Sequence, residues 1–397
     1  MRILNTIGRD NVLFFLMGFI VFSPMSTSIL MDYMHMPISM PELLIIPFLF
    51  LLKKDLLSIK ITWNDIIFSG LICALLILFG LLYGRFSLYS MLSPTRSWFY
   101  IFIFYYAFKR YNSITNDHLL YISLGSIVSW MIISRLNFFS ILENRLSDQG
   151  EMCTYGAMLI VPLFITLAMS TKKYLVLIFG LMVLLPTCIF SGVRRLMVVT
   201  LLSIIISFVL SLRKSKSGFA IYGLIGAGFI VLATIVLPVV MDIVESSSPE
   251  MYYRIFGRTL SFIESGDSES AGDASRMMNI SKFFSNWFDY IIPRGMVSLH
   301  TSTDASIGLF NDFPLYQICW IFGIPVAFIF LLNFIKILIK NYMIYIRRQD
   351  ETSAYCISSL LIMGCMLFLD GTFLGFAEFA PITGVLLGIA SRNSKQL

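Results

Sequence analysis

Residues 63–83 read WNDIIFSGLICALLILFGLLY, and no charged side chain follows Asp65 in this run. A helix that crosses a bilayer needs about 20 consecutive, mostly apolar residues, so the run predicts a transmembrane helix. Comparable runs recur along the whole chain. Of its 397 residues, 57% are hydrophobic and 13% are charged, and the mean hydropathy is +0.83. So little polar surface excludes a soluble globule and predicts an all-α, polytopic integral membrane protein.

The apolar runs predict about 12 transmembrane helices in a single transmembrane domain that covers residues 1–397. We place them at residues 11–30, 38–52, 63–83, 97–108, 119–135, 152–170, 174–190, 195–212, 218–242, 313–335, 354–370 and 373–390. The first run has no small-residue cleavage site behind it, so we expect a retained helix rather than a signal peptide. The long interruption at residues 244–312 predicts one large, partly helical loop.

The charges between these runs predict the orientation, because cytoplasmic loops collect Lys and Arg. One side receives eighteen of the 29 basic residues: Arg2, Arg9, Lys53, Lys54, Lys60, Lys109, Arg110, Lys172, Lys173, Arg213, Lys214, Lys216, Lys336, Lys340, Arg347, Arg348, Arg392 and Lys395. We therefore expect both termini in the cytoplasm and the large loop in the periplasm of a bacterial inner membrane.

The predicted outer side uses arginine almost alone. Its basic residues are Arg85, Arg96, Arg135, Arg145, Arg194, Arg195, Arg254, Arg258, Arg276, Lys282 and Arg294. Guanidinium groups bind phosphate and pyrophosphate bidentately, whereas Lys supplies a point charge. The alternative for any single arginine is a contact with lipid headgroups or an acidic partner. Arg96 and Arg135, at the ends of predicted helices, suit that alternative best; Arg194 and Arg195, beside a very short connection, suit a binding site better.

The large loop carries its own helix signals. Ser248-Pro249-Glu250 supplies an N-cap, a proline at the first helical position and an acid in the first turn, which predicts a helix to about Ile263. Asp273 can cap a second helix with an apolar stripe formed by Met277, Ile280, Phe284, Trp287 and Phe288. Such a stripe packs on the protein or lies in the membrane interface. We expect this helix to hold Arg276 over the membrane domain and to end at a turn, Pro293-Arg294-Gly295.

Other chemistries have less support in the sequence. It has no glycine fingerprint for nucleotides and no metal-ligand spacing, and its six cysteines form no close pairs, so we expect no cofactor, no metal and no nucleic-acid partner. Asp370 and Glu378 flank or enter the last span and prompt a rival class, a proton-coupled transporter or lipid-linked sugar flippase. The structured loop of residues 244–312 argues against transport, because a loop of that length needs a reason. A third possibility is a noncatalytic membrane scaffold, which would not require arginines to be enriched on one side of the membrane.

The stretch from Ser191 to Pro325 resembles the bacterial O-antigen polymerase (Wzy) and ligase superfamily of membrane glycosyltransferases. The matching pieces, in chain order, are Ser191-Gly192-Val193-Arg194, the loop arginines Arg254 or Arg258, Arg276 with Trp287, Pro293-Arg294-Gly295, Asn311-Asp312-Phe313-Pro314-Leu315-Tyr316 and Phe322-Gly323-Ile324-Pro325. Ligases of this superfamily usually carry a histidine just before the asparagine of the closing pair. Here Phe310 precedes Asn311, and the only loop histidine is His300. The resemblance therefore favours a polymerase over a ligase.

The resemblance implies a GT-C-like architecture and a reaction on undecaprenyl-pyrophosphate-linked oligosaccharides at the periplasmic face. A hydroxyl of one repeat unit attacks the anomeric carbon of the growing chain and displaces undecaprenyl pyrophosphate. Positive charge must face that leaving group, and the residues expected to supply it are Arg194 and Arg276, supported by Arg195, Arg254, Arg258 and Arg294. Asp312, then Asp273, are the candidate general bases, although either could be a cap or an ion-pair partner. The implied partners are membrane lipid, a Wzz-like chain-length regulator and a Wzx-like flippase.

Overall fold

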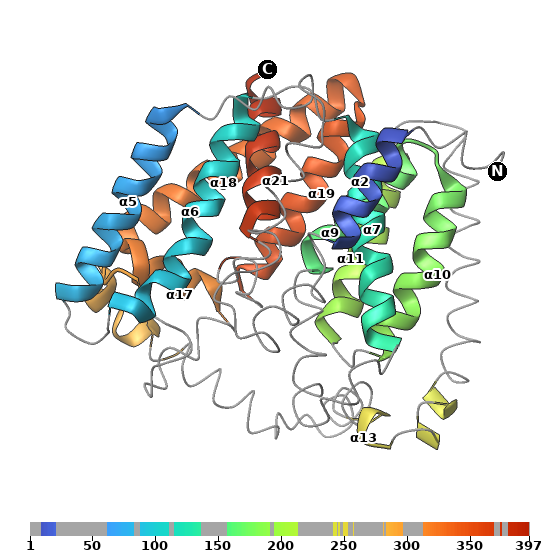
Figure 1. The fold of residues 1–397 in the computed structure, drawn as a ribbon, viewed down its shortest axis with the longest axis horizontal. Helices are drawn as coiled ribbons and strands as arrows, with labels where there is room; N and C mark the ends of the chain where they lie inside the picture. Colours follow the sequence, from blue (N-terminus) through green and yellow to red (C-terminus); the bar gives the residue numbers. More distant parts are fainter. Residues whose placement is uncertain are drawn as a thin grey trace.

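The computed structural model describes residues 9–20, 62–82, 88–110, 115–135, 157–190, 194–212, 241–243, 245–246, 249–252, 257, 281, 283–296, 313–368, 374 and 380–396. Every regular element in these ranges is helical, so the all-α prediction is confirmed. The longer helices run side by side in one bundle (Figure 1). In this view α5 and α6 stand at one side, α2, α7 and α10 at the other, and α19 and α21 between them.

The helices follow the predicted apolar runs closely where hydropathy alone delimits them. Their bounds are α2 Arg9–Ile20, α5 Trp63–Leu82, α6 Leu88–Arg110, α7 Asn116–Arg135, α9 Ala157–Ser170, α10 Tyr174–Phe190, α11 Arg194–Leu212, α13 Pro249–Tyr252, α17 Pro314–Phe322, α18 Ile324–Arg348, α19 Glu351–Met366 and α21 Ala380–Asn393, with 3-10 turns η4 Trp287–Tyr290 and η5 Ser394–Gln396. The span predicted at 38–52 lies outside the described residues, as does the span predicted at 218–242 apart from residues 241 and 242. The prediction of about 12 transmembrane helices stays a prediction.

Two of the predicted spans were wrong in their bounds. The run at 313–335 is two helices, because Gly323 adopts a φ of 81° and Pro325 follows at the start of α18. Helix α18 then continues to Arg348, so Lys336 and Lys340 lie in a helix rather than in a loop. The span predicted at 97–108 begins at Leu88. Arg96 therefore lies inside α6 and not at its end, whereas Arg135 is the last residue of α7, as expected.

Serine and threonine side chains lie inside the bundle beside its apolar core, and many large apolar side chains lie on the surface. Helices α9 and α19 are buried over most of their length. The fully or nearly fully buried polar residues include Ser69, Ser123, Ser126, Ser129, Thr166, Thr200, Ser203, Ser207, Ser358 and Ser359. Thr166 and Ser207 join α9 to α11 through a 2.7 Å hydrogen bond. By contrast, α5 exposes Leu71, Leu75 and Leu78 by more than half.

Length and hydropathy single out two of the described helices as able to cross a membrane. They are α5, with a mean hydropathy of 2.5 over its most apolar window, and α18, with 1.8. Only 28% and 17% of those windows are buried within the protein. Shorter apolar helices cover residues within α2, α9, α10 and α11. Exposed apolar faces of this kind mark surfaces that meet a partner protein or a membrane.

Glycines allow the closest helix contacts. Gly384 and Gly388 on α21 lie against α6, where an added Cβ would come within 2.6 Å of the Ile101 carbonyl oxygen and 2.7 Å of that of Tyr105. On α2, a Cβ at Gly18 would meet the backbone of Ile122 in α7. Small residues spaced four apart permit this close approach of helix backbones, which is a common packing device where the hydrophobic effect does not drive helices together.

Side-chain contacts show which helix termini lie together at each of the two ends of the bundle. The basic end is where α6, α18 and α21 end, with Lys109, Arg110, Arg347, Arg348 and Arg392 in their last turns. It is linked by Arg110 with Asp65, Tyr105 with Ser391, Arg348 with Gln396, Asn116 with Glu351 and Lys173 with Asp117. The Tyr345 hydroxyl near the end of α18 donates to the Leu210 carbonyl oxygen near the end of α11. Helix α11 therefore begins at the opposite end, where α5 ends and α18 begins.

Candidate functional site

The structure describes only part of the predicted site. Arg194 and Arg195 are the first two residues of α11, and their backbone lies at the end of the bundle opposite the basic end. The side chain of Arg294 is described, and it lies at this same end, beside the last turn of α17. Helix α13 starts at Pro249, as predicted. The remaining predicted site residues lie outside the described residues: Arg254, Arg258, Asp273, Arg276 and Asp312, as do His300, Asp370 and Glu378.

Arg294 is held by aromatic rings. The central guanidinium carbon lies 5.0 Å from the centre of the Tyr290 ring and 4.8 Å from that of Trp320. Its Nε donates to the Asp289 carbonyl oxygen at 3.3 Å, and its backbone N–H donates to the Trp320 carbonyl oxygen at 2.9 Å. A cation over an aromatic ring gains about 0.5–2 kcal/mol, more as water is excluded. The two rings and the two hydrogen bonds together fix the position of the Arg294 side chain.

The rings under Arg294 belong to a larger cluster, here called the aromatic end of the bundle: Phe283, Tyr290, Phe313, Tyr316 and Trp320. Tyr316 and Trp320 lie one turn apart on α17, and both are nearly fully buried. Phe283 packs edge-on against Tyr316 at 5.2 Å between ring centres, and the Tyr316 and Tyr290 hydroxyls lie 3.3 Å apart. Edge-to-face pairs of this kind fix ring positions. The cluster therefore fastens the segment that carries Arg294 to α17.

The turn at Pro293-Arg294-Gly295 is also fastened to α5. Gly295 has a φ of 78°, and an added Cβ would come within 2.2 Å of the Leu76 carbonyl oxygen and 2.3 Å of the Gly80 nitrogen. The next backbone N–H, of Met296, donates to the Leu76 carbonyl oxygen at 3.0 Å. Only glycine fits such an approach at positive φ. The helical segment ends before Pro293, as predicted, and the turn at Pro293-Arg294-Gly295 stays a prediction.

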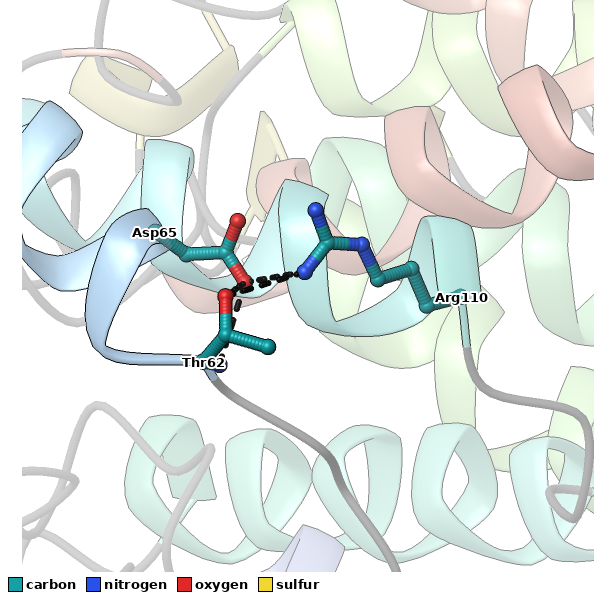
Figure 2. Close-up of polar contacts among 3 residues, drawn as sticks. All are labelled: Thr62, Asp65 and Arg110. Carbon is teal, nitrogen blue, oxygen red and sulfur yellow. Dashed lines mark hydrogen bonds and ion pairs between the residues drawn. The ribbon is translucent and has the colours of Figure 1, made fainter.

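At the basic end an arginine is held differently (Figure 2). One Nη atom of Arg110, at the end of α6, lies 2.6 Å from an Asp65 carboxylate oxygen in the first turn of α5. That oxygen also accepts from the backbone N–H of Thr62 at 3.1 Å and from its hydroxyl at 2.7 Å. Asp65 is 5% exposed, so this carboxylate both caps α5 and ties it to α6. We call these three residues the clasp.

Our reading of the sequence missed two parts of this arrangement. The clasp was not predicted, although Thr62 three residues before Asp65 is a helix-start signal. The contacts of Arg294 with the rings of Tyr290 and Trp320 were also missed. Tyr316 and Trp320, four residues apart in an apolar run, and Phe283 and Tyr290, seven apart, could have indicated two facing aromatic stripes. Among the described residues, no group of three or more His, Cys, Asp or Glu side chains could hold a metal ion.

The chain was compared with protein families, curated proteins and solved structures. No family model, no curated protein and no solved structure matches it.

Proposed function

We propose that this chain is a membrane glycosyltransferase of the O-antigen polymerase type, acting at the outer face of a bacterial inner membrane. In the proposed reaction a hydroxyl oxygen of the incoming lipid-linked repeat unit forms a bond to the anomeric carbon of the growing chain. The bond from that carbon to the undecaprenyl pyrophosphate breaks, and the pyrophosphate leaves with the electron pair. The hydroxyl proton passes to a base, for which Asp312 and then Asp273 are the candidates.

The observation that carries this proposal is the arginine bias of one predicted side of the chain. A departing pyrophosphate develops charge on its oxygens, and several preoriented guanidinium groups can stabilise that charge. Arg194 and Arg276 are the leading residues of the proposed clamp, with Arg195, Arg254, Arg258 and Arg294 in support. The seat of Arg294 on Tyr290 and Trp320 supports its part in the clamp, because ring stacking presents a guanidinium in a fixed orientation.

The proposed membrane placement has independent support in the packing. Helices α5 and α18 expose long apolar faces, while serine and threonine side chains gather inside the bundle. In water this arrangement would be unfavourable by about 25 cal/mol for every Å² of apolar surface left exposed. In a bilayer it is the expected one, since helices there pack through small and weakly polar residues. The proposed orientation, with cytoplasmic termini and a periplasmic loop at 244–312, rests on the distribution of Lys and Arg between the apolar runs.

Deleting the gene in its own strain tests the proposal. Electrophoresis of the surface polysaccharide should show single repeat units in place of the ladder of polymer lengths, and the polyprenyl carrier should hold single repeat units on the outer face. Polymer that accumulates on the carrier would indicate a ligase instead. Single units stranded on the cytoplasmic side would indicate a flippase, and an unchanged ladder would exclude all three.

Substitutions at the two leading arginines test the proposed clamp. Arg194→Lys and Arg276→Lys each keep a positive charge but lose the bidentate fork. Each should abolish the ladder while the protein remains in the membrane at its normal level, as measured by immunoblot of membrane fractions. Normal ladders from both variants would remove these residues from the site. A chelator should leave the polymerisation rate of the native protein unchanged, because we expect no metal.

A further inference from the structure

Residues 284–292 carry an apolar face that the rest of the described protein does not cover. The exposed fractions are 62% for Phe284, 42% for Trp287, 67% for Phe288, 39% for Ile291 and 60% for Ile292. These residues lie along a segment that passes from a short helical stretch at residues 283–285 through the 3-10 turn η4 to a bend at Ile291 and Ile292, and all five are exposed. Five side chains contribute to this apolar face, not one. We call it the outer wedge.

The opposite face of the same segment is fixed to the bundle. Phe283 is 7% exposed and packs against Tyr316, and Tyr290 lies against Trp320. A third edge, formed by Asn286 and Asp289, is polar and exposed. The segment thus has a buried aromatic face, an exposed apolar face and a polar edge. This division is the one expected of an element that lies in a membrane interface.

The point along α5 at which this segment is attached indicates what covers the apolar face of the outer wedge. The Met296 N–H bonds to the carbonyl oxygen of Leu76, which lies six residues before the end of α5. At 1.5 Å per residue, this attachment point lies about 9 Å along α5 from its end. Because α5 is one of the two helices able to cross a membrane, the turn meets it within the span and not above it. Interfacial elements bury their apolar face by about 5–10 Å.

The outer wedge also continues the apolar surface of its neighbours. An added Cβ at Gly323 would come within 2.7 Å of the Ile291 carbonyl oxygen and 3.2 Å of Pro293, so the segment touches the start of α18. It therefore lies between α5 and α18, whose exposed faces include Leu78 and Phe328. In Figure 1 it is the gold segment at the lower ends of α5 and α6. Within the segment the Asp289 N–H donates to the Asn286 carbonyl oxygen at 3.1 Å and the Ile291 N–H to that of Phe288 at 3.3 Å. Internal pairing of this kind is what insertion into lipid requires.

We propose that the outer wedge inserts into the outer leaflet of the bilayer, with Phe284, Phe288 and Ile292 among the acyl chains and Trp287, Asn286 and Asp289 at the headgroup level. This inference rests on the membrane placement given under the proposed function, but not on the glycosyltransfer reaction. Its consequence is that Arg294, next to the contact between the turn and α5, is held within the outer leaflet and close to the lipid phosphates. A lipid-linked diphosphate would then reach the guanidinium by moving sideways within the leaflet.

Spin labels in liposomes test the insertion. The six cysteines are replaced, and a nitroxide is attached at Phe288→Cys, at Leu75→Cys on the exposed face of α5, or at Asn286→Cys on the polar edge of the segment. Power saturation then compares collisions with oxygen, which concentrates among acyl chains, with collisions with a water-soluble nickel chelate. We expect oxygen to dominate at Leu75→Cys and Phe288→Cys, and the nickel chelate to gain several-fold at Asn286→Cys.

The outcomes separate the inference from its premise. Nickel dominating at Phe288→Cys while oxygen dominates at Leu75→Cys would overturn the wedge and leave the membrane placement standing. Nickel dominating at both would overturn the placement itself. Shielding of Phe288→Cys from both reagents would also overturn the wedge: spin–spin broadening would then identify a second copy as the cover, and its absence another segment of this chain.

A second measurement needs no substitution. The native protein is reconstituted with phospholipids that carry a photoactivatable diazirine near the middle of one acyl chain. After illumination, mass spectrometry should find lipid adducts on peptides containing residues 284–292 as well as on α5 and α18. Adducts on α5 and α18 but none on residues 284–292 would contradict the insertion.

Discussion

The two ends of the bundle hold arginine in different ways. At the basic end Arg110 meets the Asp65 carboxylate at 2.6 Å, and Lys173 meets Asp117 at 2.7 Å. At the aromatic end Arg294 lies over the rings of Tyr290 and Trp320. At the basic end a carboxylate pairs with the guanidinium and ties two helices together, whereas at the aromatic end ring faces contact the guanidinium. The comparison indicates that residue type alone does not tell how an arginine is held; its neighbours do.

The largest effect should come from the turn that carries Arg294. Gly295→Val should destabilise the protein by several kcal/mol, because the new side chain would enter the space of the Leu76 carbonyl oxygen and the backbone is at positive φ. Thermal unfolding in detergent, followed by circular dichroism, measures the change. Gly70→Ala is the matched control, since nothing lies within 4 Å of a Cβ there, and it should be neutral or slightly stabilising. Equal melting temperatures for Gly295→Val and the native protein would contradict the packing of this turn on α5.

The clasp at the basic end should matter less, and only for stability. Asp65→Ala removes a helix cap and a hydrogen-bonded ion pair whose arginine is 49% exposed, so we expect a loss of about 2 kcal/mol after allowing for solvent screening. Asp117→Ala is the control at the same end. Both partners of its pair are partly exposed, at 29% for the Lys173 side chain and 45% for that of Asp117, and the loss should be about 0.5 kcal/mol. Both variants should extend polysaccharide normally once folded, and a loss of polymerisation in stable Asp65→Ala would contradict the division between the two ends.

The smallest effect should come from loosening the seat of Arg294. Tyr290→Leu removes one of the two rings under the guanidinium, which is worth about 1.4 kcal/mol and should slow chain extension about tenfold. Tyr290→Phe keeps the ring and loses only the hydroxyl contact with Tyr316, so it should restore the rate. The readout is the initial rate of polymer formation at saturating lipid-linked substrate. A slow Phe variant beside a normal Leu variant would indicate that the hydroxyl, and not the ring, is what matters.

The sequence was sufficient to predict the helices where apolar runs have clear polar borders. Residues 174–190 were predicted as found, and α11 differs from its prediction by one residue at its start. The prediction of helix bounds failed where apolar residues continue across the break between two helices. Nothing in the apolar character of residues 313–335 marks the change of direction, which depends on the positive φ of Gly323 and the packing of that glycine on Ile291. Helix α18 also extends past Lys336, because long basic side chains on a helix can reach polar surroundings.

The site was predictable in residue type but not in its supports. The loop arginines were noticed because the predicted outer side has almost no lysine, whereas the predicted inner side mixes both residues. The turn at Pro293-Arg294-Gly295 was predicted from its proline and glycine. The ring contacts that hold Arg294 join residues up to thirty positions apart, from Tyr290 to Trp320. Contacts between distant segments leave only a weak periodic trace in one sequence. The clasp joins Asp65 to Arg110 across two helices for the same reason.

The most direct measurement compares one conservative substitution at each end. Lipid-linked repeat units that accumulate in the deletion strain are extracted and supplied to purified protein in nanodiscs, and polymer formation is timed. Arg294→Lys should extend chains about 100-fold more slowly than the native protein, because a lysine cannot supply the fork that a leaving pyrophosphate needs. Arg348→Lys, at the basic end, should stay within about twofold. A native rate for Arg294→Lys, or equal losses in both variants, would contradict the proposal that Arg294 belongs to the pyrophosphate clamp.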